Sequence, residues 1–271
     1  MRLASIINFW DCGELLPIVV KNMRKLVDGI IIVFSDSSNY RDYINNTAFL
    51  NDPVFEGCHI FRCEPLTSLQ PMDNERRKRN FGLEKAKELG FTHFLDQDAD
   101  ELYEHEPFLK EKERFLNPEL NGLCCACEVF FKSPTLSVGL DITIVPFIHK
   151  IMPDLRHEWN KNYPFAFVNG GIRVDPTRQL SYTSGIEWSN IVMKHYSYIR
   201  KDLEQKIRNS TARHNIERST LRQDFVIAKA GEFCNFYGKV LTTAPNTFNI
   251  PDYGEFLRKD LQPDKTADKA T

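Results

Sequence analysis

Apolar runs alternate with amphipathic segments through the first hundred residues, and this alternation restricts the chain to few folds. The run at 29–34 is apolar at every position after its glycine, which is typical of a strand buried on both faces of a parallel sheet. The pattern also predicts strands at 4–9, 58–63 and 91–95 and helices at 14–26 and 73–89. This β-α-β order predicts an α/β fold with a mostly parallel sheet flanked by helices.

The second half of the chain has a different pattern, in which strand-like segments follow one another. Strands are expected at 123–132, 142–152, 166–174 and 191–196, and helices at 200–208 and 221–231. From residue 263 the sequence is polar, and we expect a frayed tail there. The sequence therefore predicts a mixed β and helical second half.

Composition places the chain among ordinary globular proteins. Its 271 residues carry a formal net charge of −2, so nothing global indicates nucleic acid or membrane as a partner. No stretch approaches the length of apolar sequence that a transmembrane helix needs. Seven cysteines are present, three of them clustered at Cys124, Cys125 and Cys127. Without a second paired set, buried reduced thiols are favoured over a zinc site, which predicts a reducing, cytoplasmic setting.

The predicted strand at 91–95 runs into an acidic segment. Asp96, Asp98, Asp100 and Glu101 fall within six positions, and such a group of carboxylates repels itself unless a cation lies nearby. Mg²⁺ and Mn²⁺ bind carboxylate oxygens together with substrate phosphates. The segment therefore suggests a metal held for a phosphorylated substrate, with a solvated acidic loop as the alternative.

Polar residues follow three of the predicted strands. They occupy positions 8–14, 35–39 and 96–101. Open α/β sheets bind ligands beyond the carboxyl ends of their strands. We therefore expect these three segments to share the functional edge of the sheet.

Four segments resemble the family 2-like glycosyltransferases, which have the Rossmann-like nucleotide-diphospho-sugar transferase (GT-A) fold. The likeness covers roughly residues 3 to 215 in pieces. The four segments are Ile6-Ile7-Asn8 with Glu14-Leu15-Leu16-Pro17, Arg76 to Leu83, Thr92 to Tyr103, and Met193 to Leu203. They resemble the family's N-E-x-x-L-P turn, its K-R-N-x-G-L helix, its D-x-D-E-x-Y strand end and its M-H-H-x-S-Y-V-R-x-D segment.

The resemblance implies a metal site. Asp98 and Asp100 match the two carboxylates of D-x-D, and His195 matches the histidine ligand of the C-terminal segment. An imidazole ligand favours Mn²⁺ over Mg²⁺. Asp96-Gln97-Asp98 offers a rival register, and a core histidine on a strand is the alternative for His195.

The resemblance also implies which residues bind the donor nucleotide. They are Asn8, Asp36, Arg79, Asn80 and Asp98. Asp36 would recognise the base or the ribose, although it could equally form an Asx turn with the serines that follow. Arg79 would reach a phosphate or the base, whereas Arg76 and Arg77 are expected on a solvated helix face.

An inverting enzyme of this family needs a carboxylate that deprotonates the acceptor hydroxyl. Glu187 and Asp175 are the candidates, and each could equally be structural. Aromatic residues could shape an acceptor groove or belong to the core. They are those of segment 129–134 together with Trp159, Tyr163, Phe165 and Phe167.

The resulting hypothesis is a metal-dependent, inverting glycosyltransferase that moves a sugar from a nucleotide diphosphate, with UDP-hexose as the expected donor, to a hydroxyl acceptor. Residues 1–103 would bind the donor and 104–262 the acceptor, with 263–271 as a tail. One alternative is a phage-type DNA glycosyltransferase acting on a hydroxymethylated base, using the basic residues between Arg200 and Arg222. A non-catalytic nucleotide-sugar-binding protein is another. A nucleotidyltransferase would need a glycine-rich basic loop after the first strand, which is missing from 8–14.

Overall fold

A computed structural model describes the chain except for residues 161–162, 164–172, 183, 211–218 and 254–271. Within the described residues the helices are α1 (Leu16–Met23), α2 (Asn46–Phe49), α3 (Pro71–Glu88), α4 (His105–Glu113), α5 (Leu203–Asn209) and α7 (Leu221–Ile227). The strands are β1 (Leu3–Phe9), β2 (Gly29–Phe34), β3 (His59–Arg62), β4 (His93–Asp98), β5 (Glu101–Leu102), β6 (Gly122–Phe131), β7 (Leu136–Lys150), β8 (Arg173–Val174), β9 (Ile186–Tyr198), β10 (Phe233–Cys234), β11 (Lys239–Val240) and β12 (Thr242–Thr243).

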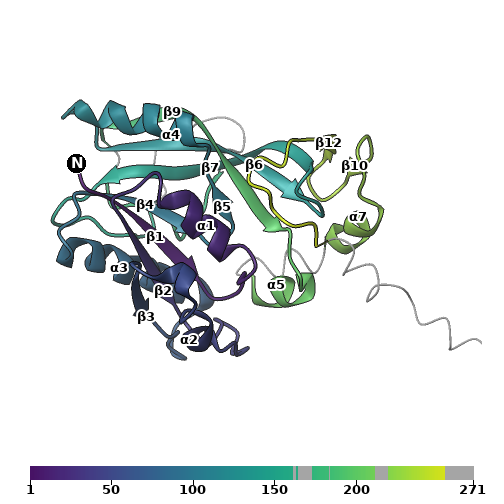
Figure 1. The fold of residues 1–271 in the computed structure, drawn as a ribbon, viewed down its shortest axis with the longest axis horizontal. Helices are drawn as coiled ribbons and strands as arrows, with labels where there is room; N and C mark the ends of the chain where they lie inside the picture. Colours follow the sequence, from purple (N-terminus) through teal and green to yellow (C-terminus); the bar gives the residue numbers. More distant parts are fainter. Residues whose placement is uncertain (161–162, 164–172, 183, 211–218, 254–271) are drawn as a thin grey trace, which may run out of the picture. The chain divides into compact units, whose positions relative to one another are not determined.

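The N-terminal part of the sheet is parallel, as the sequence predicts (Figure 1). β1 pairs in parallel with β2 on one side and with β4 on the other, and β2 pairs in parallel with β3. β1 and β2 are almost entirely buried, which accounts for their continuous apolar sequences. The predicted α/β class with a mostly parallel sheet flanked by helices is confirmed.

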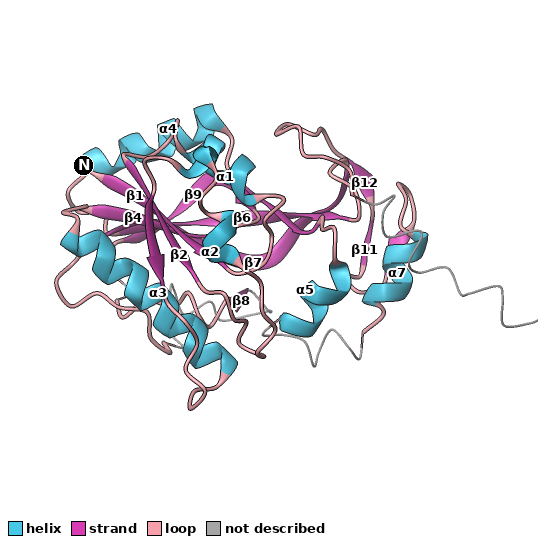
Figure 2. Cartoon of the chain, turned by 60° about the horizontal axis from the view of Figure 1, so that its bottom comes forward, coloured by secondary structure: helices cyan, strands magenta, loops and turns pink. Residues whose placement is uncertain are grey.

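Helices cover this sheet on both sides. Figure 2 shows α3 on one side of the sheet and α1 and α4 on the other. α3 packs closely on β1 and β2 because residue 82 is glycine: a Cβ atom there would lie 2.5 Å from Ile6 Cγ2 and 3.0 Å from Val33 Cγ2. The helix ends at the predicted position, where Gly90 adopts a φ of +73° that favours glycine.

Beyond β4 the sheet becomes mixed. The strand order is β3-β2-β1-β4-β7-β6-β9-β5, and β7 is antiparallel to β4. β7 and β9 are longer than predicted, beginning at Leu136 and Ile186. Of the strand predicted at 166–174, Arg173 and Val174 form β8, and the remainder lies outside the described residues.

Two local predictions need correction. β4 extends to Asp98, so Asp96, Gln97 and Asp98 belong to the strand and not to a loop after it. α3 begins at Pro71 after Gln70, so neither Asp73 nor Asn74 is the N-cap. The Asn74 side chain instead holds the preceding loop, accepting from Leu66 N and donating to Leu66 O.

The chain divides into two compact units. The first comprises Met1–Glu128 and Leu140–His195, and the second comprises Val129–Gly139 with the described residues from Tyr196 onward. In the second unit, β10 pairs with β11 and β12 pairs with the start of β7, while the Phe131 ring packs on Tyr198 and Phe225. The division into donor and acceptor halves at residue 103 concerns ligands and stays a prediction. The expected tail at 263–271 lies outside the described residues.

Within the described chain, no helix has both the length and the hydrophobicity that a membrane crossing requires.

The close packing of α3 predicts the effect of enlarging residue 82. Gly82→Val should lower the free energy of unfolding by about 2–3 kcal/mol because the side chain overpacks against β1 and β2. Glu84→Val, at an exposed position of the same helix, should change it by less than about 1 kcal/mol. Urea unfolding measures both, and equal effects of the two substitutions would contradict the packing.

Candidate functional site

The acidic segment lies where the order of the parallel strands reverses. From β1 the chain proceeds to β2 on one side and returns to β4 on the other, and Asn8 of β1 is paired with Asp98 of β4. In open α/β sheets the ligand crevice lies beyond the carboxyl ends of such strands. The acidic segment at the end of β4 therefore occupies the position expected for a ligand site.

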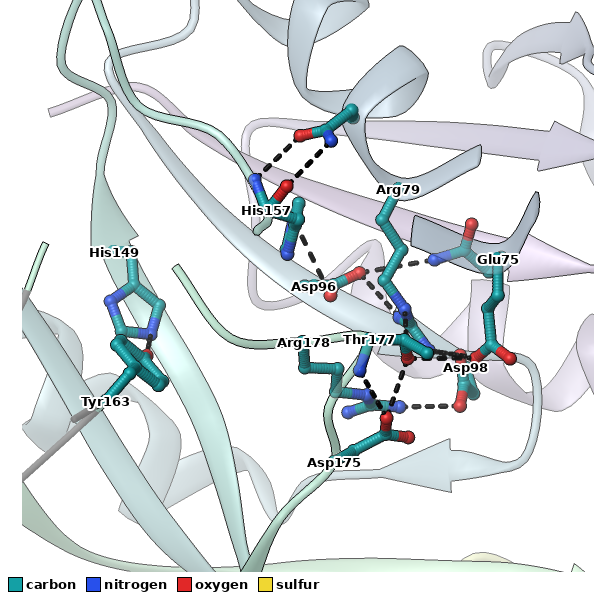
Figure 3. Close-up of polar contacts among 12 residues, drawn as sticks. Glu75, Arg79, Asp96, Asp98, His149, His157, Tyr163, Asp175, Thr177 and Arg178 are labelled. Carbon is teal, nitrogen blue, oxygen red and sulfur yellow. Dashed lines mark hydrogen bonds and ion pairs between the residues drawn. The ribbon is translucent and has the colours of Figure 1, made fainter. Parts of the chain in front are cut away.

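Asp96 and Asp98 are two residues apart on β4 and share one face of the sheet. Both bind Arg79 of α3, at 2.9 Å from Asp96 Oδ1 and 3.0 Å from Asp98 Oδ1 (Figure 3). The Arg79 side chain is fully buried, and it also binds Glu75 at 2.9 Å. A buried guanidinium surrounded by three carboxylates is a structural ion pair, so the two aspartates of the rival register are held by Arg79.

A second arginine binds the acidic segment from the loop that follows β8. Arg178 is 4% exposed, and its Nη2 lies 2.6 Å from Asp98 Oδ2. The same guanidinium contacts both Glu101 oxygens, at 2.5 and 3.2 Å. The neighbouring Thr177 hydroxyl accepts from Arg79 Nε, and its oxygen lies 3.2 Å from Glu75 Oε1. Sequence reasoning missed Arg178 and Thr177, because no pattern marks a contact across so many residues; Glu75 was expected only as an i, i+4 partner on a solvated helix face, and it pairs with the buried Arg79.

The arginines and burial set the charge states of the two carboxyl groups. Burial alone would raise the pKa of Asp98, but Arg178 and Arg79 hold it well below its ordinary value. Burial raises the pKa of Glu101 to about 7, with Arg178 opposing the shift. Asp98 is therefore a firmly ionised anchor, whereas the charge of Glu101 is sensitive to its surroundings.

The short strand β5 brings three potential metal ligands together. It pairs with β9 so that Glu101 lies opposite His195. Ligand atoms of Asp100, Glu101 and His195 all lie within 4.8 Å of one another. Burial would lower the pKa of His195, but the Asp100 carboxylate, 3.6 Å from Nε2, raises it well above its ordinary value. Two carboxylates and an imidazole suit a divalent cation such as Mn²⁺.

The residues predicted to bind the nucleotide form hydrogen bonds or ion pairs with other residues of the protein. Asn8 donates to Asp96 Oδ1 at 3.2 Å. Asp36 is 2% exposed, and both of its carboxylate oxygens are bound. They accept hydrogen bonds from the backbone and hydroxyl of Thr47 and form an ion pair with Arg62. Asn80 donates to His157 O and accepts from His157 N. Asn8 lies at the acidic segment, while Asp36 and Asn80 fasten loops.

The two candidate bases lie in different surroundings. Asp175 accepts from the backbone and hydroxyl of Thr177, each at 2.7 Å, and through Thr177 it joins the Arg79 network (Figure 3). Glu187 binds Arg114 near the start of β9. It precedes His195 by eight strand residues, or about 27 Å. Asp175 is therefore connected to Arg79 through Thr177, whereas Glu187 lies farther along β9 from His195.

The other aromatic and cysteine residues serve mainly in the core. Phe130, Phe131 and Tyr163 are buried, and Trp159 is 64% exposed. Phe165 and Phe167 lie outside the described residues. The seven cysteines are free thiols, and among the described residues none joins a group of three potential metal ligands.

No family model and no curated protein matches the chain. Among solved structures, residues 1–349 of S. aureus TarS are 12% identical with a TM-score of 0.43, over 77% of this chain and 64% of that one. TarS 1–349 in complex with UDP-GlcNAc aligns at 14% identity and a TM-score of 0.33, over 48% and 35%. A mannose-1-phosphate geranyltransferase from Thermus thermophilus aligns at 14% and 0.33, over 50% and 44%. The chain spans less than two thirds of the length of each of these structures.

The position of Arg178 predicts a large effect on stability. Arg178→Met leaves the buried Glu101 without its guanidinium partner and removes one of the two arginines that bind Asp98, so it should lower the free energy of unfolding by about 3 kcal/mol. Arg76→Met removes a pair with the half-exposed Asp73 and should cost less than about 1 kcal/mol. Denaturant unfolding compares the two variants, and a small effect at residue 178 would contradict the structural role of the ion pair.

His149 predicts a separate dependence of stability on pH. The ring is buried between Tyr182, 2.7 Å from Nδ1, and Tyr163, 3.3 Å from Nε2, and burial lowers its pKa to about 3. In the unfolded chain the His149 imidazole binds a proton below about pH 6.5, whereas in the folded chain it stays neutral. The free energy of unfolding therefore falls as the pH falls. Between pH 7 and pH 5 the wild type should lose about 2 kcal/mol more than His149→Gln. Parallel pH profiles in chemical unfolding would contradict this.

Proposed function

We propose that the protein is a metal-dependent glycosyltransferase that moves a sugar, with UDP-hexose as the expected donor, to a hydroxyl acceptor on a glycan or small molecule. The observation that supports this most is the pairing of β5 with β9, which gathers Asp100, Glu101 and His195 at the carboxyl edge of the sheet. The sequence resemblance to GT-A enzymes includes Asp100 and His195 in the same roles.

Asp100 and His195, with Glu101 beside them, are the residues that would hold Mn²⁺ or Mg²⁺. A bound cation supplies charge that stabilises the leaving diphosphate. Both oxygens of Asp98 are bound by arginines, which favours a supporting role for this residue. In this proposal Asp98 fixes the end of β4, so that Asp100 and Glu101 are presented in a constant position.

Asp175 is the residue that we propose as the catalytic base. Its Oδ1 accepts two hydrogen bonds from Thr177, which orient the carboxylate, and Thr177 in turn accepts from Arg79, which binds the acidic segment. A carboxylate so placed could accept the proton of an acceptor hydroxyl as that hydroxyl attacks the anomeric carbon, with inversion of configuration. Tethering by Thr177 limits the motion of this base.

The DNA-directed alternative has less support. Arg200 is 3% exposed, and Arg222 binds Glu204 through two contacts of 2.7 Å. Arg213 and Arg218 lie outside the described residues. Arginines that are buried or ion-paired contribute little to a phosphate-binding surface, so these two residues do not favour a nucleic acid as the acceptor.

A donor screen tests the proposal. UDP or GDP release from a panel of nucleotide sugars should require Mn²⁺ or Mg²⁺ and stop with EDTA. Asp100→Asn and His195→Gln should each lower kcat at least about 100-fold by removing a metal ligand. His105→Gln, an exposed histidine on α4, serves as the control and should retain activity.

Transfer that continues in EDTA, or full activity of Asp100→Asn, would overturn the proposed metal site. Tight donor binding without any transfer or hydrolysis would instead favour the non-catalytic nucleotide-sugar-binding protein.

A further inference from the structure

Lys78 extends from α3 to the ends of two parallel strands. Its Nζ donates to Phe9 O at 2.6 Å and to Ser35 Oγ at 3.3 Å. Phe9 is the last residue of β1, and Ser35 directly follows β2. The ammonium group therefore lies at the carboxyl edge of the sheet, where open α/β folds bind ligands.

The Lys78 ammonium has no anionic partner within the described part of the chain, since both of its hydrogen-bond acceptors there are neutral. Burying a cation without an anion costs free energy, and burial lowers the pKa of Lys78 to about 8. Four groups around it oppose that shift without pairing with it. They are Cys63, Glu75, Asp98 and Glu64.

The neighbouring basic residues of α3 already have partners within the protein. Arg79 is fully buried among three carboxylates, Arg76 binds Asp73, and Arg77 donates to the backbone oxygen of Glu64. An ammonium group has three N–H donors, and two of those of Lys78 go to neutral oxygens. Arg77, like Lys78, has a neutral acceptor, but Lys78 is the base of this segment whose ammonium lies at the ends of both β1 and β2.

We propose that the Lys78 ammonium binds a phosphate group of the donor diphosphate at the carboxyl edge of β1 and β2. The inference rests on the proposed function, and it transfers the phosphate-binding role from Arg79 to Lys78. A lysine acts as a point charge toward phosphate and forms charge-assisted hydrogen bonds. The alternative role is a clamp that holds the ends of β1 and β2 together.

Calorimetric titration of the full chain in EDTA separates the two roles. The probes are inorganic pyrophosphate, UDP and uridine. Lys78→Met should lower the affinity for pyrophosphate and UDP about tenfold or more, while uridine, which lacks phosphate, binds as in the wild type. Lys78→Arg keeps the charge and should retain most of the affinity. Lys85→Met, nearer the other end of α3, is the control and should bind all three probes normally.

Acetylation of the wild-type protein gives a second readout that does not depend on a variant folding. Saturating pyrophosphate should slow acetylation of Lys78, measured by mass spectrometry, and leave Lys85 unchanged.

Three outcomes would overturn the inference. They are failure of the wild type to bind pyrophosphate or UDP, equal affinities of wild type and Lys78→Met, and an equal loss of uridine binding. The proposed function fails separately. If pyrophosphate binds through Lys78 but no nucleotide sugar is consumed, the assignment of Lys78 stands and the glycosyltransferase proposal falls. If donor is consumed while Lys78→Met binds UDP normally, the reverse holds.

Discussion

The ion pairs of Arg79 and Arg178 with the end of β4 are the interactions on which the candidate site depends. Carboxylates at adjacent or alternate positions repel one another strongly when water is excluded. Here two buried guanidinium groups lie between them, one from α3 and one from the loop after β8. The acidic segment can therefore fold without a bound metal. The negative charge of the segment therefore does not by itself indicate a metal ion. The support for a metal site comes from the geometry of Asp100 and His195.

The same ion pairs divide the carboxylates into two groups with different chemistry. Asp96 and Asp98 face the arginines and are held by them, so their oxygens serve the structure. Asp100 lies beyond the end of β4, next to His195 of β9. Glu101 contacts Arg178 and also belongs to the metal-ligand group. It therefore links the two groups, and its pKa is raised by burial, which Arg178 and His195 oppose.

Much of the fold could be predicted from local patterns. Continuous apolar runs identified β2, and helical periodicity with Gly90 identified the end of α3. The extension of β4 through Asp98 could not be predicted, because buried aspartates in a strand depend on Arg79, a residue on another element. The pairing of Glu101 with His195 and the approach of Arg178 likewise join distant segments. Contacts between distant segments cannot be read from a single sequence. The family resemblance supplied only the residue types at the site.

The comparison of Lys78 with Arg79 shows why motif position alone does not assign a role. Successive residues of an α-helix point about 100° apart, so two adjacent bases leave the helix in different directions. On α3 that rotation directs Arg79 toward Asp96 and Asp98 and directs Lys78 toward the ends of β1 and β2. The deeper side chain is the longer one, and its guanidinium binds three carboxylates at once. The Lys78 ammonium remains at the edge of the sheet, which is where the proposed phosphate would bind. The neighbouring charges, more than the position in the motif, therefore decide which base can bind a ligand.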